Sequence, residues 1–315
     1  MKQFIAKHSP LFILAGLCIA MALYSSDFSG RGNLQSVAMR TSVVGIIAVG
    51  ELLVILTAGI DLSVGSVAAL SAVVGCIVMK SMGDSAMALP VGLLVGCGVG
   101  MLCGLINGLL VSKGRIPPFI VTLGTMMWAR GLVLLASNGE PVFGMPDAFF
   151  WLGGANAWWV PVLLTVSIVA FFFVVLTYTP FGRSLYAIGG NRQAARLSGL
   201  PVDRSQMLAY TLSGTLAGFA GLVLASRTSI AAPMAAEMYE LEAIAACVIG
   251  GASLMGGEGG VIAALAGALI MTVLRNFCTL EDIQVYWQQV LVGGLIVILV
   301  YYDSMRKRKA GLIGD

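Results

Sequence analysis

Few residues in this sequence could do chemistry, and the types that catalysis needs are not grouped together. The single histidine, His8, stands near the N-terminus, which excludes a Ser-His-Asp triad. The six cysteines form no C-x-x-C pair, so a metal centre or redox motif is not expected. No G-x-x-x-x-G-K-[ST] phosphate-binding loop occurs. The sequence therefore predicts neither an enzyme nor a chain that itself holds a cofactor or metal.

Acidic residues within apolar sequence are the better candidates for a polar site. Glu51 lies halfway along an apolar segment, where a charge is costly and needs a partner or a water-filled cavity. The apolar segment breaks at 59–61, and Asp61 with Ser63 is typical of a helix N-cap. Alternative interpretations stay open at both positions. Glu51 lines a pathway, makes an interhelical hydrogen bond or faces lipid, and Asp61 either caps the next helix or faces the same pathway.

A second candidate segment is the loop 178–206, whose middle is expected to form a short helix. Asn191 can cap the start of this helix, Gly199 suits a left-handed stop, and Pro201 prevents continuation. Arg192 and Arg196 are four residues apart and share one face. A capped surface helix of this kind is typical of a docking site for another protein, whereas the simpler alternative is a loop that only carries charge.

The third segment, 239–260, combines acidic residues with three pairs of glycines. Irregular backbone at membrane depth is tolerated only against protein or a water-filled cavity. Its stretch 250–254 also weakly echoes the break at 59–62. The candidate residues for a substrate pathway are Glu51, Thr57, Asp61, Ser63 and Glu242.

The elements that must position these residues follow from composition. The chain has 315 residues, of which 58% are hydrophobic and only 10% are charged, too few to cover a soluble fold of this size. Apolar runs long enough to cross a bilayer predict an all-α integral membrane protein with about ten transmembrane helices. The candidate spans are 9–26, 41–60, 62–79, 85–112, 116–139, 148–182, 205–226, 243–257, 259–274 and 283–302. The span 243–257 is the weakest, and we expect it to be broken or re-entrant.

The distribution of charge gives the orientation. With ten spans and both termini in the cytoplasm, most Lys and Arg residues fall inside, among them Lys2, Lys7 and 306–309, and most acids fall outside. Arg40 and Arg275 are among the few bases expected in the outer loops, and Arg130 is left within a span. The N-terminal run 11–24 has features of a signal peptide, but no small-x-small cleavage site follows, so we expect it to be retained as the first span. Glycines recur every four residues from Gly92 to Gly108, which predicts one helix face pressed closely against a neighbour.

The three segments together resemble the membrane permeases of bacterial ribose-type sugar importers of the ATP-binding-cassette class. The matching stretches are AVGELLVILTAGIDLSVGS (48–66), YAIGGNRQAARLSGLPV (186–202) and YELEAIAACVIGGASLMGGEG (239–259). Their order and spacing agree, and the resemblance covers nearly the whole chain. One departure is Glu51, where relatives are expected to carry Met or Gln.

The resemblance implies a single permease domain (1–315) in the bacterial inner membrane that imports a ribose-like pentose or related monosaccharide by alternating access. It implies three partners: a cytoplasmic two-cassette ATPase that holds ATP and magnesium, an external sugar-binding protein, and a second permease copy or a sister chain. No nucleic acid is expected. The loop 178–206 would be the coupling loop, and Arg192 and Arg196 would pair with acids on the ATPase. The coupling residues expected from the resemblance are Gly190, Asn191, Arg192, Ala194, Ala195, Arg196, Ser198 and Gly199.

The competing prediction is a secondary transporter that uses protons through Glu51. It differs in that the chain alone would move substrate on a pH gradient, whereas the importer needs the ATPase.

Overall fold

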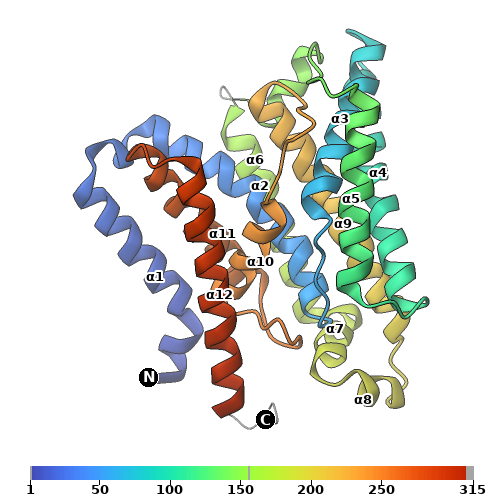
Figure 1. Cartoon of the computed structure of the whole chain (residues 1–315), viewed down its shortest axis with the longest axis vertical. Coiled ribbons are helices and arrows are strands. Elements are labelled where there is room, and N and C mark those ends of the chain that lie inside the picture. The colour runs from blue at the N-terminus through green and yellow to red at the C-terminus, as the bar shows by residue number, and fades with distance from the viewer. Residues whose placement is uncertain (1, 155–156, 310–315) are drawn as a thin grey trace.

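The computed structural model describes residues 2–154 and 157–309, and these are almost entirely helical, with no strand among them. The side chains of Lys2, Lys7 and 306–309 lie outside the described residues, so their placement in the cytoplasm stays a prediction. The helices are α1 (Lys2–Tyr24), α2 (Arg31–Ile55), α3 (Val64–Met82), α4 (Ala88–Ser112), α5 (Pro118–Ser137), α6 (Trp159–Tyr178), α7 (Pro180–Gly190), α8 (Arg192–Leu197), α9 (Val202–Thr228), α10 (Tyr239–Ile249), α11 (Val261–Leu280) and α12 (Val285–Lys309), with 3-10 turns η1 (Ser26–Ser29) and η2 (Asp147–Leu152) (Figure 1).

Seven helices in the described part of the chain are long and apolar enough to cross a membrane: α2, α3, α4, α5, α6, α9 and α11. The all-α membrane class is therefore confirmed. The expected spans 9–26 and 283–302 overlap α1 and α12, respectively, except for two residues at one end of each. The total of about ten spans and the position of the termini stay predictions.

Helix α10 confirms the expectation of a broken span. It has 11 residues, which at 1.5 Å per residue reach only about 16 Å of the ~30 Å hydrocarbon core. Beyond Ile249 the chain turns through left-handed glycines, with φ of +87° at Gly251 and +88° at Gly256. The segment therefore enters the bundle as half a helix and continues as irregular backbone to α11.

Helix α2 forms the centre of the bundle, and every residue from 41 to 57 is buried. An apolar helix with no polar face belongs in such a core position, and α2 is packed by α9, α11, α10 and α6. The position of Glu51 in this stretch means that its carboxyl group faces protein on all sides.

The glycine stripe brings α4 against α9 at backbone distance, as predicted. A methyl group on Gly100 or Gly104 would overlap the carbonyl oxygens of Gly214 and Tyr210, respectively, on α9. Without a hydrophobic drive between helices in lipid, such close contact supplies the packing energy. Because glycine at these positions lets α4 approach α9 closely, Asn107 on the same helix lies next to the core.

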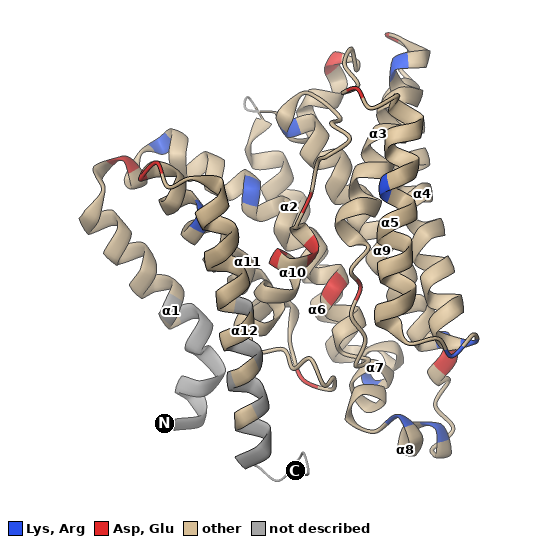
Figure 2. Ribbon diagram, in the orientation of Figure 1, with Lys and Arg blue, Asp and Glu red and all other residues tan. Residues whose placement is uncertain are grey.

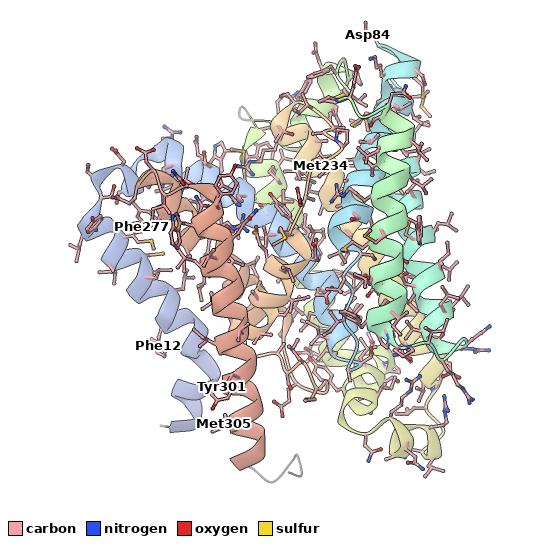
Figure 3. All side chains as sticks on the ribbon, in the orientation of Figure 1. Phe12, Asp84, Met234, Phe277, Tyr301 and Met305 are labelled. Carbon is pink, nitrogen blue, oxygen red and sulfur yellow. The ribbon has the colours of Figure 1, made fainter. Side chains whose placement is uncertain are left out.

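Helices α7 and α8 lie at the same end of the bundle as the start of α1 and the end of α12 (Figure 1). Tyr301 and Met305 of α12 mark this end, and Asp84, which follows α3, marks the opposite one (Figure 3). The structure therefore places α7, α8, the start of α1 and the end of α12 at one end of the bundle, and the assignment of this end to the cytoplasm stays a prediction.

Candidate functional site

The helix pair α2–α3 is interrupted by an irregular segment, 56–63, deep in the bundle. Ala58 adopts φ of +59°, and the following Gly59 lies so close to the Tyr210 hydroxyl that a methyl group there would overlap it. Thr122 of α5 donates to the Ile60 carbonyl at 3.3 Å. The predicted break at 59–61 is confirmed, and its backbone polar groups are partly satisfied by side chains from neighbouring helices.

A polar cluster fills this break, and Glu51 and Asp61 are its acidic members. Glu51 is 0% exposed and Asp61 1%. The Asp61 backbone N–H donates to Glu51 Oε1 at 3.1 Å, so Glu51 closes the turn between the two helices. Asp61 Oδ1 accepts from the Ser63 N–H at 3.0 Å and from the Ser63 hydroxyl at 2.5 Å. Ser63 is the N-cap residue of α3 but makes no side-chain cap bond, because its hydroxyl turns to Asp61.

The polar cluster extends into α4 and α5 through residues that sequence reasoning missed. Asn107 Nδ2 donates to Ser63 Oγ at 2.9 Å, and the Thr125 hydroxyl donates to Asn107 Oδ1 at 2.5 Å. Both side chains are buried. In the sequence, the polar amide of Asn107 within the glycine-striped apolar span 85–112 was the feature that could have indicated this polar contact. The chain of hydrogen bonds ties the break to two further membrane-spanning helices.

Two carboxylate oxygens of the polar cluster, Glu51 Oε2 and Asp61 Oδ2, are buried and meet no hydrogen-bond partner in the described part of the chain. The hydroxyl groups of Tyr210 and Ser213 on α9 are unpartnered in the same way. Buried polar atoms are usually paired, so these four mark a place able to exchange bonds with hydroxyl groups. The geometry excludes lipid exposure for Glu51 and shows a hydrogen bond to the break.

The structure places two predicted pathway residues outside this cluster. The Thr57 hydroxyl donates to the Val54 carbonyl at 2.8 Å, which satisfies the last turn of α2. Glu242, in the first turn of α10, is 0% exposed and forms an ion pair with Arg275 Nη2 of α11 at 2.7 Å. Arg40 Nη2 of α2 is 3.8 Å from the same carboxylate oxygen.

The ion-paired Glu242 and the polar cluster lie at different depths. Arg40 and Glu51 are eleven residues apart on α2, so about 16 Å separates them along the helix axis. Figure 2 shows acidic residues in the interior of the bundle, near α10 and α2. The sequence placed Arg40 and Arg275 on the outer loops, whereas the structure places both on helices, where they anchor α10 to α2 and α11.

Arg130, the charge predicted to lie within a span, holds the irregular segment before α10. Its Nη1 donates to the Pro233 carbonyl at 2.6 Å and to the Ala235 carbonyl at 3.1 Å. Met234, between these two acceptors, is visible on that segment in Figure 3. The Arg130 guanidinium on α5 thus donates hydrogen bonds to two backbone carbonyl groups that lie outside any helix.

Helices α7 and α8 form the predicted capped surface element. Asn191 Oδ1 accepts from the Ala194 N–H at 2.9 Å and caps α8, and Gly199 adopts φ of +78° after its end. Seven of the eight expected coupling residues are exposed. The exception is Ala195, which packs against Ile188 and Val202. Leu197, at the end of α8, is 83% exposed and was not among the predicted residues.

The two arginines of α8 are bonded within the chain. Arg196 Nη2 pairs with Asp203 Oδ1 of α9 at 2.7 Å, and Arg192 Nη2 contacts Gln206 Oε1 at 2.8 Å. Lys and Arg gather along α8 and the loops beside it (Figure 2). These bonds fix α8 to the start of α9 while leaving the guanidinium groups about half exposed.

Comparison with known proteins agrees with this geometry. A model of the family described as "Branched-chain amino acid transport system / permease component" matches residues 33–300. The ribose import permease of Bacillus subtilis is 40% identical over 96% of this chain and 94% of its own length. The ribose import permease of Haemophilus influenzae is 38% identical over the same shares. The L-arabinose permease AraH of Escherichia coli is 37% identical over 96% of this chain and 92% of its own. No solved structure matches the chain significantly.

The matches cover more than nine tenths of both sequences, and the described part of the chain contains seven helices long and apolar enough to cross a membrane. The chain is a multi-pass protein of the bacterial inner membrane, and it belongs to the branched-chain amino acid transport system permease family, in its branch of monosaccharide ABC permeases.

Proposed function

We propose that this chain is the membrane-spanning subunit of an ATP-driven, binding-protein-dependent importer of a ribose-like pentose or a related sugar. The observation that carries the proposal is the full-length similarity to ribose and arabinose permeases at 37–40% identity. We further propose about ten spans with both termini in the cytoplasm, a second permease copy or sister chain, and an external sugar-binding protein.

The substrate pathway in this proposal runs past the polar cluster of Glu51, Asp61, Ser63 and Asn107. Unpartnered carboxylate and hydroxyl oxygens exchange hydrogen bonds readily with the hydroxyl groups of a monosaccharide. The cluster is closed off by helix packing in the present conformation, so alternating access must open the break before a sugar reaches it. Thr57 and Glu242 shape the pathway indirectly, by ending α2 and by anchoring α10.

The ATPase in this proposal docks on α8 and holds ATP and magnesium. Exposed Leu197 offers an apolar contact of the kind that a partner surface buries, and Gly190, Asn191, Ala194, Ser198 and Gly199 lie exposed around it. Arg192 and Arg196 keep their charges at the surface while Asp203 and Gln206 fix their positions. Such pre-arranged guanidinium groups suit acids on the ATPase.

A proton-driven transporter that uses Glu51 is not favoured. The named relatives are permeases of ribose and arabinose transport systems, and Glu51 already has a structural role because it accepts the Asp61 N–H.

A complementation experiment tests the proposal. A bacterial strain without its own ribose and arabinose permeases receives this chain with its ATPase and binding protein, and uptake of labelled D-ribose, L-arabinose and D-galactose is measured. We expect saturable uptake of one of these sugars, abolished when the ATPase is inactivated. Uptake that persists with the inactive ATPase would contradict the proposal.

A further inference from the structure

The surface helix pair makes direct backbone contact with both breaks inside the bundle. Gly189 of α7 faces the Leu56 carbonyl oxygen, at the end of α2, and the Gly257 nitrogen, in the irregular segment after α10. A methyl group at Gly189 would overlap both atoms. The two breaks are themselves joined, because the Gly257 N–H donates to the Leu56 oxygen at 3.1 Å.

Tyr186, one turn earlier on α7, adds a side-chain bond to the same place. Its hydroxyl donates to the Gly259 carbonyl at 2.9 Å. Burial raises the pKa of Tyr186, so the phenol keeps the proton that it donates. We call the contacts of Tyr186 and Gly189 with Leu56, Gly257 and Gly259 the α7 joint.

The α7 joint lies between the proposed docking helix and the polar cluster. Gly190 and Asn191 connect α7 directly to α8, so a displacement of α8 moves Gly189 with it. On the other side, Leu56 is five residues from Asp61, which is bonded to Glu51. The contacts at Gly189 are with backbone atoms, which cannot rotate away as a flexible side chain would. Movement of α8 is therefore transmitted to both breaks through rigid backbone contacts.

We propose that Tyr186 and Gly189 are positioning residues for transport, which pass the movement of the ATPase from α8 to the two membrane breaks through the α7 joint. The inference rests on the proposed function, since it needs an ATPase that moves α8. It goes further because it names the contact that links the docking helix α8 to the substrate pathway.

Two helical glycines supply a matched pair of variants. Gly189→Ala pushes α7 away from both breaks, whereas Gly98→Ala on α4 adds the same methyl group at a position with nothing within 4 Å. Both glycines lie in α-helices and neither has a positive φ, so both variants gain helix propensity. A difference between the two variants therefore reports the contact at Gly189 and not the added methyl group itself.

The first readout is independent of the sugar. In a background with the six cysteines replaced by alanine, exposed Met255 of the irregular segment is changed to Cys, and maleimide labelling is measured with and without ATP in the full transporter. We expect ATP to change the labelling rate in the parent and in Gly98→Ala, but not in Gly189→Ala. An equal ATP effect in the two glycine variants would overturn the inference. A parent without any ATP effect would refute the proposed function as well.

The second readout is uptake of D-ribose, L-arabinose and D-galactose per ATP hydrolysed. A displaced joint is expected to lower this ratio about tenfold or more in Gly189→Ala, while Gly98→Ala stays within about twofold of the parent. If Gly189→Ala fails to assemble with the ATPase, the variant Tyr186→Phe tests the inference instead. It removes only one hydrogen bond, so a fall of roughly two- to tenfold is expected. An unchanged ratio in Tyr186→Phe would then overturn the inference.

Discussion

The buried ion pair between Glu242 and Arg275 predicts an asymmetric response to the removal of its two members. Arg275→Met leaves a carboxylate that is 0% exposed and whose one remaining partner among the described residues is Arg40, at 3.8 Å. Loss of one partner of a buried pair costs about 3–5 kcal/mol, and Arg40 places this variant near the lower end, at about 3 kcal/mol. Glu242→Gln instead leaves two arginine side chains that are 11% and 24% exposed and reach polar surroundings more easily. We expect a cost of about 1–2 kcal/mol for Glu242→Gln.

The double variant, Glu242→Gln with Arg275→Met, separates the interaction between the two residues from the interaction of each with its surroundings. With both charges removed, no carboxylate remains unpaired, so the double variant should be about as stable as Glu242→Gln alone, with a coupling free energy of roughly 2–3 kcal/mol. The free energy of unfolding is measured by SDS titration of the purified protein in mixed micelles, followed by circular dichroism. Arg31→Met, at an exposed position in the first turn of α2, is the control and should change stability by less than about 0.5 kcal/mol. Additive costs, or a larger loss for Glu242→Gln than for Arg275→Met, would refute the argument.

Further predictions concern packing, the polar cluster and docking. Asn107→Leu removes the bond to Ser63 and leaves the buried Thr125 hydroxyl without its acceptor, which should lower the free energy of unfolding by about 1–3 kcal/mol in the same titration; no loss would show that the Thr125 hydroxyl finds another partner. Gly104→Val should destabilise the protein by at least about 1–3 kcal/mol more than Gly98→Val, because only Gly104 abuts the α9 backbone, and equal losses would exclude the glycine interface. Leu197→Asp should leave stability within about 0.5 kcal/mol but weaken co-purification of the ATPase; undiminished capture would remove Leu197 from the docking surface.

Helix class and helix order were predictable because the apolar runs are long and end at glycine, proline or charge. The caps of α8 were predictable for a local reason. Asn191 bonds a residue three positions ahead, and Gly199 needs only its own left-handed backbone. Such features depend on neighbours in sequence, which a single chain displays directly.

The partners of the candidate site residues were not predictable, since they come from distant segments. Glu242 is paired with Arg275 of α11, although sequence position alone put that arginine on the outer face. Asn107 reaches Ser63 across 44 positions. A periodic pattern identifies the face of a helix but not the depth at which it meets another helix, so the polar cluster became visible only in three dimensions.

The proposal that an ATPase drives this permease is tested most directly by uptake into proteoliposomes of defined content. The purified chain is reconstituted alone or with its ATPase and binding protein, and labelled sugar uptake is compared under internal ATP and under an imposed pH gradient. The account predicts uptake only in the complete assembly and only with ATP. Uptake by the chain alone on the pH gradient, lost in Glu51→Gln, would contradict it and identify a proton-coupled transporter.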